Sequence, residues 1–271
     1  MPPVRPLDEQ TILITGSTDG LGLATAERLK RSGATVFVHG RSEQKLERAL
    51  ARLGADRGAR VRGLLADLSS LEEVRRLARC VERDTDRLDV LVNNAGVAAM
   101  DGRRTSRDGF ELTFAVNYLS HFLLTAELLP LLRTSAPARI VNVASIGQAP
   151  VNFEDPMAEE REYDGFLAYR ESKLAQILFT FELVERLREG GAEGVTRERA
   201  APRDADGHPD GSPELWAGDE RGGGGGGGTC PPDRGPGAGR SQRPVLRSAR
   251  GGGGAGTRRH TTRTHAGGSG R

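Results

Sequence analysis

The stretch Thr11–Gly22, T-I-L-I-T-G-S-T-D-G-L-G, decides the fold of this 271-residue chain. An apolar, β-branched run typical of a buried strand leads into a glycine-rich turn, and a helical pattern over Gly20–Arg31 follows directly. Glycines permit a tight turn, and the free N–H groups at a helix N-terminus favour the pyrophosphate of a dinucleotide. A plain β–α turn is the alternative, but the strand before the glycines and the helix after them favour nucleotide binding.

Short apolar runs and longer helical patterns alternate along the rest of the first 196 residues, which is typical of βαβ units. The patterns predict further strands at Ala34–Val38, Arg60–Leu65, Leu88–Asn93 and Arg139–Ala144. They predict further helices at Glu43–Leu53, Leu71–Glu82, Phe110–Leu132 and Gly165–Glu189. This order of elements predicts a doubly wound parallel sheet, the α/β architecture of a Rossmann domain.

The periodic pattern ends where a sixth strand has just begun, at Val195 and Thr196. The remaining 75 residues contain 21 glycines, and their only members of the Leu/Ile/Val/Phe set are Leu215, Val245 and Leu246. Such a segment cannot bury enough apolar surface to offset its ordering entropy. We expect an incomplete nucleotide-binding domain over residues 1–196, truncated after strand five or six, and a disordered Gly/Arg/Pro-rich tail over residues 197–271. Strand five would then be an unpaired sheet edge.

The small net charge of +2 conceals a basic tail, because residues 197–271 carry +5 and the first 196 residues therefore carry −3. A near-neutral domain argues against nucleic acid as a partner, and the tail lacks the interleaved aromatic side chains of single-strand binders. The N-terminus has no apolar run of a signal peptide, and no apolar stretch predicts a membrane segment. Two cysteines are too few for a disulfide framework or a metal site. These features predict a cytoplasmic protein.

The segment His39–Ser42, H-G-R-S, follows the second predicted strand. A carboxylate at this place would bind a ribose 2′-hydroxyl, whereas an arginine suits a 2′-phosphate. Arg41 therefore favours NADP(H) over NAD(H), and a solvated arginine at the start of the next helix is the alternative. His39 is expected to lie in the loop without a ligand role. After the third strand, Asp67 could accept a hydrogen bond from an adenine amino group or cap the following helix.

Two further motifs carry candidate site residues. N-N-A-G, Asn93–Gly96, follows strand four, where small residues leave room for a cofactor and the asparagine side chains can tie neighbouring strands and loops together. Tyr169 and Lys173 form Y-x-x-x-K on a helix, and this spacing places both side chains on one face. A nearby ammonium favours the phenolate form of a tyrosine, so Tyr169 could exchange a proton near neutral pH. The same spacing also arises by chance on amphipathic helices.

In this order, T-G-x-x-x-G-x-G, N-N-A-G, a serine after strand five and Y-x-x-x-K resemble the short-chain dehydrogenase/reductase family over Thr11–Thr196. The resemblance implies hydride transfer between NADP(H) and an alcohol, aldehyde or ketone. It implies that Tyr169 is the general acid/base and that Lys173 lowers its pKa and holds the nicotinamide ribose. Ser145 would bind the substrate oxygen, and Asn117 would anchor a water that relays protons. The cofactor-binding residues that the resemblance implies are Gly16, Ser17, Thr18, Gly20, Leu21, Gly22, Arg41, Asp67, Asn93, Ala95, Gly96, Tyr169 and Lys173.

The interval between Ser145 and Tyr169 is long for this family, and its extra segment, Ala149–Gly165, is acidic and carries Phe153 and Tyr163. This segment and the helix sequence A-Y-R-E-S-K-L-A-Q-I-L-F-T-F-E-L resemble the retinol-dehydrogenase-like branch. That resemblance implies a lipophilic substrate and an insert beside the substrate pocket. An inert surface loop is the alternative for the insert.

Two expectations concern the long helices. His121 lies one helical turn after Asn117 and is expected to be structural. The resemblance also implies that the helices predicted at Phe110–Leu132 and Gly165–Glu189 could pair in a homodimer.

In this family the segment after Thr196 should read like V-T-x-N-x-x-x-P-G, forming strand six and a substrate loop. If one nucleotide is dropped after the Thr196 codon, GC-rich codons for Arg197–Asp210 can read A-N-A-L-H-P-G-T-L-M-D-T-P. We therefore hypothesise that residues 197–271 are translated out of frame, and a genuine disordered tail is the alternative. A second function hypothesis is a catalytically dead remnant with at most weak nucleotide binding, which measurable turnover would exclude.

Overall fold

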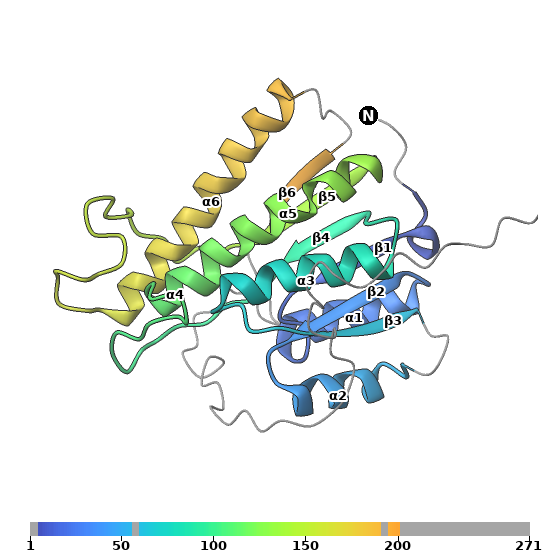
Figure 1. The fold of residues 1–271 in the computed structure, drawn as a ribbon, viewed down its shortest axis with the longest axis horizontal. Helices are drawn as coiled ribbons and strands as arrows, with labels where there is room; N and C mark the ends of the chain where they lie inside the picture. Colours follow the sequence, from blue (N-terminus) through green and yellow to red (C-terminus); the bar gives the residue numbers. More distant parts are fainter. Residues whose placement is uncertain (1–4, 56–59, 191–194, 201–271) are drawn as a thin grey trace, which may run out of the picture. The chain divides into compact units, whose positions relative to one another are not determined.

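Six parallel strands form one sheet in the order β3-β2-β1-β4-β5-β6 (Figure 1). The computed structural model describes residues 5–55, 60–190 and 195–200. The strands are β1 (Thr11–Ile14), β2 (Thr35–Gly40), β3 (Val61–Leu65), β4 (Val90–Asn93), β5 (Ala138–Val143) and β6 (Val195–Ala200). The helices are the 3-10 turn η1 (Leu7–Glu9), α1 (Gly20–Arg31), α2 (Glu43–Arg52), α3 (Leu71–Asp84), α4 (Leu112–Phe114), the π-helical turn η2 (Ala115–Leu119), α5 (Ser120–Thr134) and α6 (Gly165–Glu189). The predicted doubly wound parallel sheet is confirmed.

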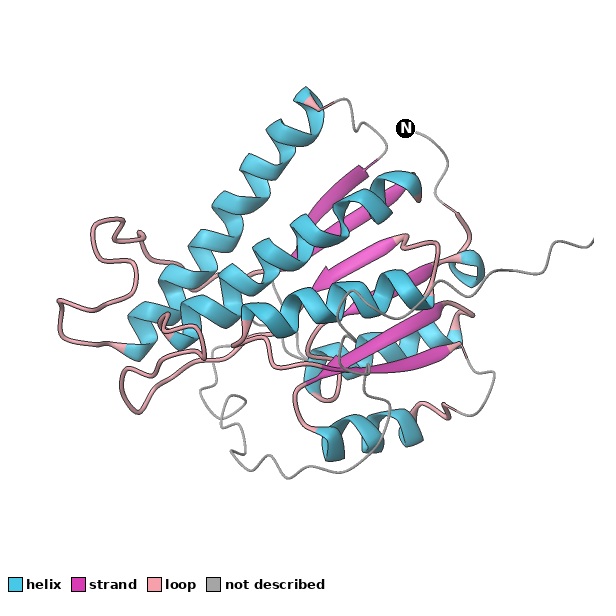
Figure 2. Cartoon of the chain, viewed as in Figure 1, coloured by secondary structure: helices cyan, strands magenta, loops and turns pink. Residues whose placement is uncertain are grey.

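Helices α3, α5 and α6 cover one face of the sheet, and α1 and α2 cover the other (Figure 2). Side chains along β1 alternate between these faces, as they do along any strand. Leu13 packs in the core beneath α3 and α5, whereas Ile12 and Ile14 pack in the core beneath α1 and α2. A strand covered on both faces is apolar at successive positions, which explains the continuous apolar run of β1.

The strand order reverses at β1, which has β2 on one side and β4 on the other. The loops that follow β1 and β4 therefore diverge at the carboxyl edge of the sheet, and ligands of doubly wound sheets bind in the crevice that this divergence creates. The glycine-rich turn follows β1 and the N-N-A-G motif follows β4. Both motifs thus lie at the point where the topology predicts a ligand site.

The sixth strand that the sequence predicts to begin at Val195 and Thr196 is present, and it extends four residues beyond Thr196. Residues Val195–Ala200 form β6, which pairs with β5 in parallel, with Ala138 opposite Val195. β5 is therefore not the unpaired edge that the sequence predicted. Parallel pairing uses backbone N–H and C=O groups, so the segment can extend the sheet without the apolar pattern of a buried strand. The remainder of the predicted tail, residues 201–271, lies outside the described residues.

The helix predicted at Phe110–Leu132 begins and ends two residues later, and its pitch changes inside it. It begins after Glu111, whose carboxylate accepts hydrogen bonds from the N–H groups of Thr113 (2.9 Å) and Phe114 (2.6 Å). The π-helical turn η2 then separates α4 from α5. Such turns cost regular hydrogen bonding and are frequent at functional sites, and periodicity alone does not reveal them.

The stretch Leu112–Thr134 has 23 residues and a mean hydropathy of 1.3 in its most apolar window, so its length and composition alone would allow it to cross a membrane. Half of that window is buried, and Leu124 and Leu128 are fully buried in the core that α5 shares with α3. The core helix of a soluble protein meets the same criteria. The expected lack of a membrane segment therefore stays a prediction.

Candidate active site

Glycines shape the turn after β1. Gly16 has a φ of +60°, and a Cβ at this position would lie 2.7 Å from the Cα of Ala95. A side chain at Gly22 would collide with the carbonyl of Gly16 and the side chain of Asn94. Helix α1 begins directly after Asp19, so the first N–H groups of this helix point toward the turn without intrahelical partners. This combination is suited to hold an anionic group.

The N-N-A-G motif fastens the glycine turn to β4. The amide Nδ2 of Asn94 donates to the carbonyl oxygens of Thr15 (2.9 Å) and Gly16 (3.0 Å). The Oγ1 of Thr15 in turn accepts hydrogen bonds from the N–H groups of Asn94 (2.9 Å) and Ala95 (3.0 Å). The two motifs therefore form one rigid unit, as expected for asparagines that tie strands and loops together.

Two of the predicted cofactor-binding residues use their side chains inside the fold. Asn93 is fully buried, and its Nδ2 donates to Oδ1 of Asn142 in β5 (2.8 Å). Ser17 is also fully buried, and its Oγ donates to the carbonyl of Ile14 (2.7 Å). A cofactor contact by Asn93 or Ser17 would therefore have to use the backbone.

His39 lies at the end of β2 and is buried, so its expected place in a loop is wrong. Its Nδ1 accepts a hydrogen bond from the N–H of Gly16 (3.1 Å), and its Nε2 lies 3.1 Å from the carbonyl oxygen of Ala66. A neutral ring with the proton on Nε2 satisfies both contacts. Burial lowers the pKa of His39 from 6.5 to about 4, although the Ala66 carbonyl and the charges of Asp67 and Glu73 raise it. The neutral ring thus ties the glycine turn to the end of β3.

Arg41 is exposed directly after β2. Ser42, rather than Arg41, caps α2, because its Oγ accepts a hydrogen bond from the N–H of Lys45 (3.4 Å). Among the described residues, none gives Arg41 a hydrogen bond or an ion pair. The close approach of Gly40 to the methyl group of Thr18 brings this end of β2 against the glycine turn. Arg41 is therefore a cation beside the predicted phosphate cradle.

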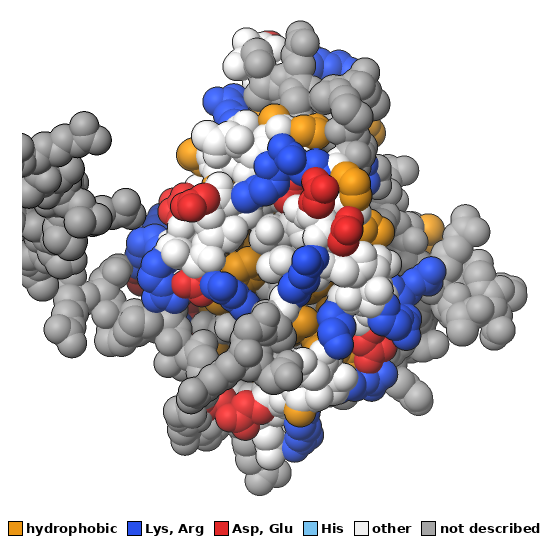
Figure 3. Space-filling model, turned by 90° about the vertical axis from the view of Figure 1, so that its right-hand side faces the viewer, with side chains coloured by type: hydrophobic (Ala, Val, Ile, Leu, Met, Phe, Trp, Pro, Cys, Tyr) orange, Lys and Arg blue, Asp and Glu red, His pale blue; other side chains and the backbone are white. Residues whose placement is uncertain are grey.

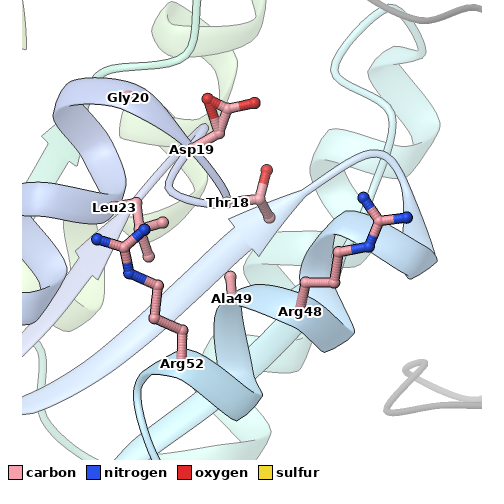
Figure 4. A pocket seen from close by; sticks show the side chains of 7 residues that line it. All are labelled: Thr18, Asp19, Gly20, Leu23, Arg48, Ala49 and Arg52. Atoms are coloured by element: carbon pink, nitrogen blue, oxygen red, sulfur yellow. The ribbon is translucent and has the colours of Figure 1, made fainter.

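A pocket of about 310 Å³ lies between the glycine turn and α2 (Figure 4). Figure 4 shows the side chains of Arg48 and Arg52 on either side of Ala49. Arg52 pairs with Glu27 of α1. The positive charge of Arg48 adds to that of Arg41 on this side of the turn. The lining residues are Thr18, Asp19, Gly20, Leu23, Arg48, Ala49 and Arg52.

Asp67 follows β3 at the same edge of the sheet. Its Oδ1 accepts a hydrogen bond from the N–H of Ser69 (3.0 Å), and its Oδ2 lies 3.4 Å from Nη2 of Arg107. Ser70 caps α3 by accepting from the N–H of Glu73 (3.4 Å). The alternative interpretation of Asp67 as the helix cap is therefore wrong, and its carboxylate remains partly exposed at the edge.

Ser145 lies in the loop directly after β5 and is half-buried. Its Oγ accepts a hydrogen bond from the N–H of Gly147 (3.1 Å), and its carbonyl accepts one from Nε2 of Gln148 (2.9 Å). Arg170 of α6 donates from Nη2 to the carbonyl of Gln148 (2.8 Å). These bonds fix the Ser145 loop against α6 next to Tyr169.

Tyr169 and Lys173 lie together on α6, as their spacing predicts. The Nζ of Lys173 lies 5.6 Å from the centre of the Tyr169 ring. The lysine is buried, and its Nζ donates to the carbonyl of Val143 at the end of β5 (3.1 Å) and to Oε1 of Gln176 (2.9 Å). Burial lowers the pKa of Lys173 from 10.5 to about 8. The ammonium thus has its place beside a tyrosine at the carboxyl edge of β5.

Asn117 lies at the centre of η2. Its Oδ1 accepts from the N–H of Val97 (2.8 Å), and its Nδ2 donates to the carbonyl of Val97 (2.9 Å) and to Oγ of Ser172 (3.0 Å). The side chain therefore joins the loop after β4 to the turn of α6 that carries Lys173. With these polar atoms engaged, the anchoring of a relay water would fall to its backbone.

The insert Ala149–Gly165 is held against α6 by an ion pair. Arg161 binds both carboxylate oxygens of Glu171, a buried residue of α6, with an Nη1–Oε1 distance of 2.9 Å. Tyr163 donates from its hydroxyl to Oε1 of Glu111 (3.0 Å), and burial together with the charge of Glu111 raises the pKa of Tyr163. The insert is thus fastened beside the first turns of α6.

Several functional contacts escaped the sequence reasoning. Gln176 holds Lys173, and its spacing of three residues on the same helix was an available signal. Arg161 and Glu171 pair between a loop and a helix, so no periodicity could have indicated them.

The comparisons with known proteins agree with this geometry. The family described as short chain dehydrogenase matches residues 10–196. Retinol dehydrogenase 13 of Mus musculus is 42% identical over 185 residues, which are 67% of this chain and 55% of that protein. The chain thus spans little more than half the length of this curated relative.

Two solved structures share the fold. A metagenomic short-chain oxidoreductase in complex with NADP has a TM-score of 0.60 and 26% identity, with 74% of this chain and 84% of that chain covered. A short chain dehydrogenase/reductase of Burkholderia phymatum in complex with NAD has a TM-score of 0.58 and 28% identity, with 72% and 66% covered. The family match over residues 10–196 and the shared fold together place this chain in the short chain dehydrogenase family.

Proposed function

We propose that the chain is an oxidoreductase that transfers a hydride between NADP(H) and a lipophilic alcohol or carbonyl compound. The observation that carries the proposal is the arrangement of Tyr169 and Lys173 beside the Ser145 loop at the carboxyl edge of β5. This edge also holds the glycine turn, and doubly wound sheets bind their ligands there. Membership of the short chain dehydrogenase family supports the same reaction class.

The residues at this edge fit a dinucleotide. The absence of a Cβ at Gly16 and Gly22 and the N-terminus of α1 provide a cradle for a pyrophosphate. Arg48 lines the pocket beside the cradle, and Arg41 is exposed directly after β2; their positive charge suits a ribose 2′-phosphate and supports NADP(H) over NAD(H). Asp67 is placed to accept a hydrogen bond from an adenine amino group. Both cofactors occur in similar structures, so the preference rests on the two arginines.

The reaction assigns a role to each polar side chain. NADP(H), when bound, supplies or accepts the hydride. In the reduction direction Tyr169 would donate its hydroxyl proton to the substrate oxygen as that oxygen gains negative charge, and Ser145 would donate a hydrogen bond to the same oxygen. Two N–H groups of Lys173 are engaged by the protein, and the third would reach a ribose hydroxyl. The lysine charge would favour the phenolate left on Tyr169.

Exposed apolar side chains around these groups support a lipophilic substrate. Ile146 follows Ser145 and is 62% exposed, and Phe166 precedes Tyr169 by one turn and is 56% exposed. Phe153 in the insert is 78% exposed. Apolar side chains that face water beside a polar site offer burial to an apolar ligand. The name of the relative, retinol dehydrogenase 13, also refers to a lipophilic alcohol.

We further propose a cytoplasmic protein that forms a homodimer through α5 and α6. Phe122 of α5 and Leu178 and Phe181 of α6 are exposed, which supports a protein contact along these helices. Basic and acidic side chains are interspersed on the face shown in Figure 3, which supports the expectation that nucleic acid is not a partner.

A second candidate function is weak nucleotide binding without catalysis. The observation that favours it is that the family match ends at residue 196, and the 75 residues that follow contain 21 glycines.

The test is NADPH oxidation by the purified full chain with decanal and retinaldehyde as substrates. We expect turnover, with kcat/KM for NADPH exceeding that for NADH. Arg41→Ser should raise the KM for NADPH about tenfold, because it removes a charge-assisted hydrogen bond, and should leave the KM for NADH unchanged. Binding of NADPH without turnover would support the second function, and an absence of binding would contradict both.

A further inference from the structure

A chain of buried side chains continues beyond Lys173 into the core. Gln176 is 1% exposed and lies one turn after Lys173 on α6. Its Oε1 accepts a hydrogen bond from Nζ of Lys173 (2.9 Å), and its Nε2 lies 2.8 Å from Nδ1 of His121 in α5. The three side chains thus form a continuous path from the tyrosine-lysine pair to a buried imidazole.

Each partner in this path constrains the next. Lysine offers only donors, so the oxygen of the Gln176 amide must face Lys173 and the nitrogen must face His121. His121 must then accept at Nδ1, which requires a neutral ring with its proton on Nε2. Burial and the charges of Lys173 and His39 lower the pKa of His121 from 6.5 to about 3, although the Asn117 carbonyl raises it. The ring therefore stays neutral at neutral pH, and the amide cannot turn over without losing its bond to Lys173 and placing its N–H donors against the ammonium.

The Gln176 turn is also anchored to the sheet. The carbonyl of Gln176 accepts a hydrogen bond from Oγ1 of Thr180 (2.7 Å), and that Oγ1 accepts one from Nδ2 of Asn142 in β5 (2.9 Å). Asn142 is in turn bonded to Asn93 of the N-N-A-G motif. Gln176 is thus fixed relative to the carboxyl edge where the reaction would occur.

We propose that Gln176, oriented by His121, is a positioning residue that holds the ammonium of Lys173 at the carboxyl end of β5. The inference rests on the proposed function, because positioning has a catalytic meaning only if Lys173 serves Tyr169 and the ribose. Besides the carbonyl of Val143, Gln176 is the acceptor that the described residues provide for Nζ. A buried ammonium that loses an acceptor is destabilised relative to the neutral amine.

The comparison between the wild type and the Gln176 variants depends on which groups face Lys173. Tyr169 faces it from α6, His121 lies behind Gln176 on α5, and β5 presents the Val143 carbonyl. A change at Gln176 alters the amide while these neighbours stay in place. Gln176→Met keeps the size and removes both hydrogen bonds. Gln176→Glu keeps an acceptor for Nζ and adds a negative charge.

The test is direct titration of Lys173 by NMR in the full chain labelled with ¹³Cε-lysine. The chain has only three lysines, Lys30, Lys45 and Lys173, so the spectrum contains three signals and the other two serve as internal references. We expect Lys173 to titrate near pH 8 in the wild type, at least one pH unit lower in Gln176→Met and at least one unit higher in Gln176→Glu. Where turnover is measurable, the pH at which kcat/KM changes on the alkaline side of its pH profile should be lower in Gln176→Met and higher in Gln176→Glu.

Two further variants complete the design. His121→Phe frees the Gln176 amide and should lower the Lys173 titration in the same direction as Gln176→Met, by a smaller amount. Glu189→Gln, an exposed position at the end of the same helix, should leave the titration of Lys173 unchanged. Unaltered titration in both Gln176 variants with intact thermal unfolding would overturn the proposal. The titration requires no turnover, so a wild-type chain that lacks activity would contradict the proposed function without deciding this inference.

Discussion

At the scale of single residues, the glycine turn depends on a buried histidine. His39 accepts from the N–H of Gly16 at Nδ1 and contacts the Ala66 carbonyl with Nε2, so the first three strands meet through one neutral ring. A second proton would remove the acceptor for Gly16. The ring is therefore useful to the fold only in its neutral form.

This dependence predicts acid sensitivity. The folded pKa of His39 is about 4 and the unfolded value is about 6.5, so between these values the unfolded chain binds more protons. The free energy of unfolding should fall as pH drops from about 6.5 to about 4, with a contribution from His39 of about 3 kcal/mol. His39→Gln, which can offer an acceptor to Gly16 and a donor to Ala66, should show a smaller fall. Urea denaturation of the wild type and of His39→Gln between these pH values measures the fall in the free energy of unfolding of each protein. Equal falls in the two proteins would contradict the role assigned to His39.

The sequence predicts the reactive residues better than the supporting ones. The spacing of Tyr169 and Lys173 places them on one helix face whatever surrounds the helix, and the structure brings them together. The inward direction of the Asn93 and Ser17 side chains depends on packing with distant residues, such as Asn142. That information is not contained in a local motif.

At the scale of elements, the insert and α6 behave as one unit because of the ion pair between Arg161 and Glu171. Glu171 is buried, so removal of Arg161 leaves an uncompensated carboxylate, which costs about 3 kcal/mol or more. We predict that Arg161→Met releases the insert, increases hydrogen exchange of its amides, and raises the KM for decanal more than the KM for a short aldehyde.

The matched control is Glu159→Gln, which removes an exposed ion pair between the insert and Arg103. Exposed ion pairs contribute little to stability. The amides of the insert should therefore exchange at the wild-type rate in this variant, and its KM values should equal those of the wild type. If the amides of the insert exchange at the wild-type rate in Arg161→Met, the insert is held by other contacts.

Periodicity predicts helices well and their irregularities poorly. Gly165–Glu189 was predicted with the bounds that α6 has, because Asp164 caps its start and the apolar pattern persists to its end. The π-helical turn around Asn117 was not predicted, since the side-chain bonds of Asn117 to the loop after β4 and to α6 join residues that are far apart in the sequence.

At the scale of the whole molecule, the first five strands and the start of the sixth follow from the sequence patterns, and the remainder of the sixth strand does not. Residues 195–200 pair with β5 although only the first two continue the expected strand sequence. Backbone pairing tolerates such residues, which is why composition alone does not mark where β6 ends.

The out-of-frame hypothesis for residues 197–271 belongs to this scale. Resequencing the gene across the codons for Val195–Asp210 should reveal one extra nucleotide, and its removal should restore A-N-A-L-H-P-G-T-L-M-D-T-P after Thr196. Confirmation of the frame as written would contradict the hypothesis and leave the genuine tail as the explanation.

The central claim is that Tyr169 is the proton donor of an NADPH-dependent reductase, and one comparison tests it most directly. The wild type and Tyr169→Phe should both bind NADPH, because the glycine turn, Arg41 and Lys173 stay in place in the variant. The kcat for aldehyde reduction should fall by a factor of about 10² to 10⁴ in the variant, as expected when a general acid is removed. A Tyr169→Phe protein that reduces decanal at the wild-type rate would contradict the account.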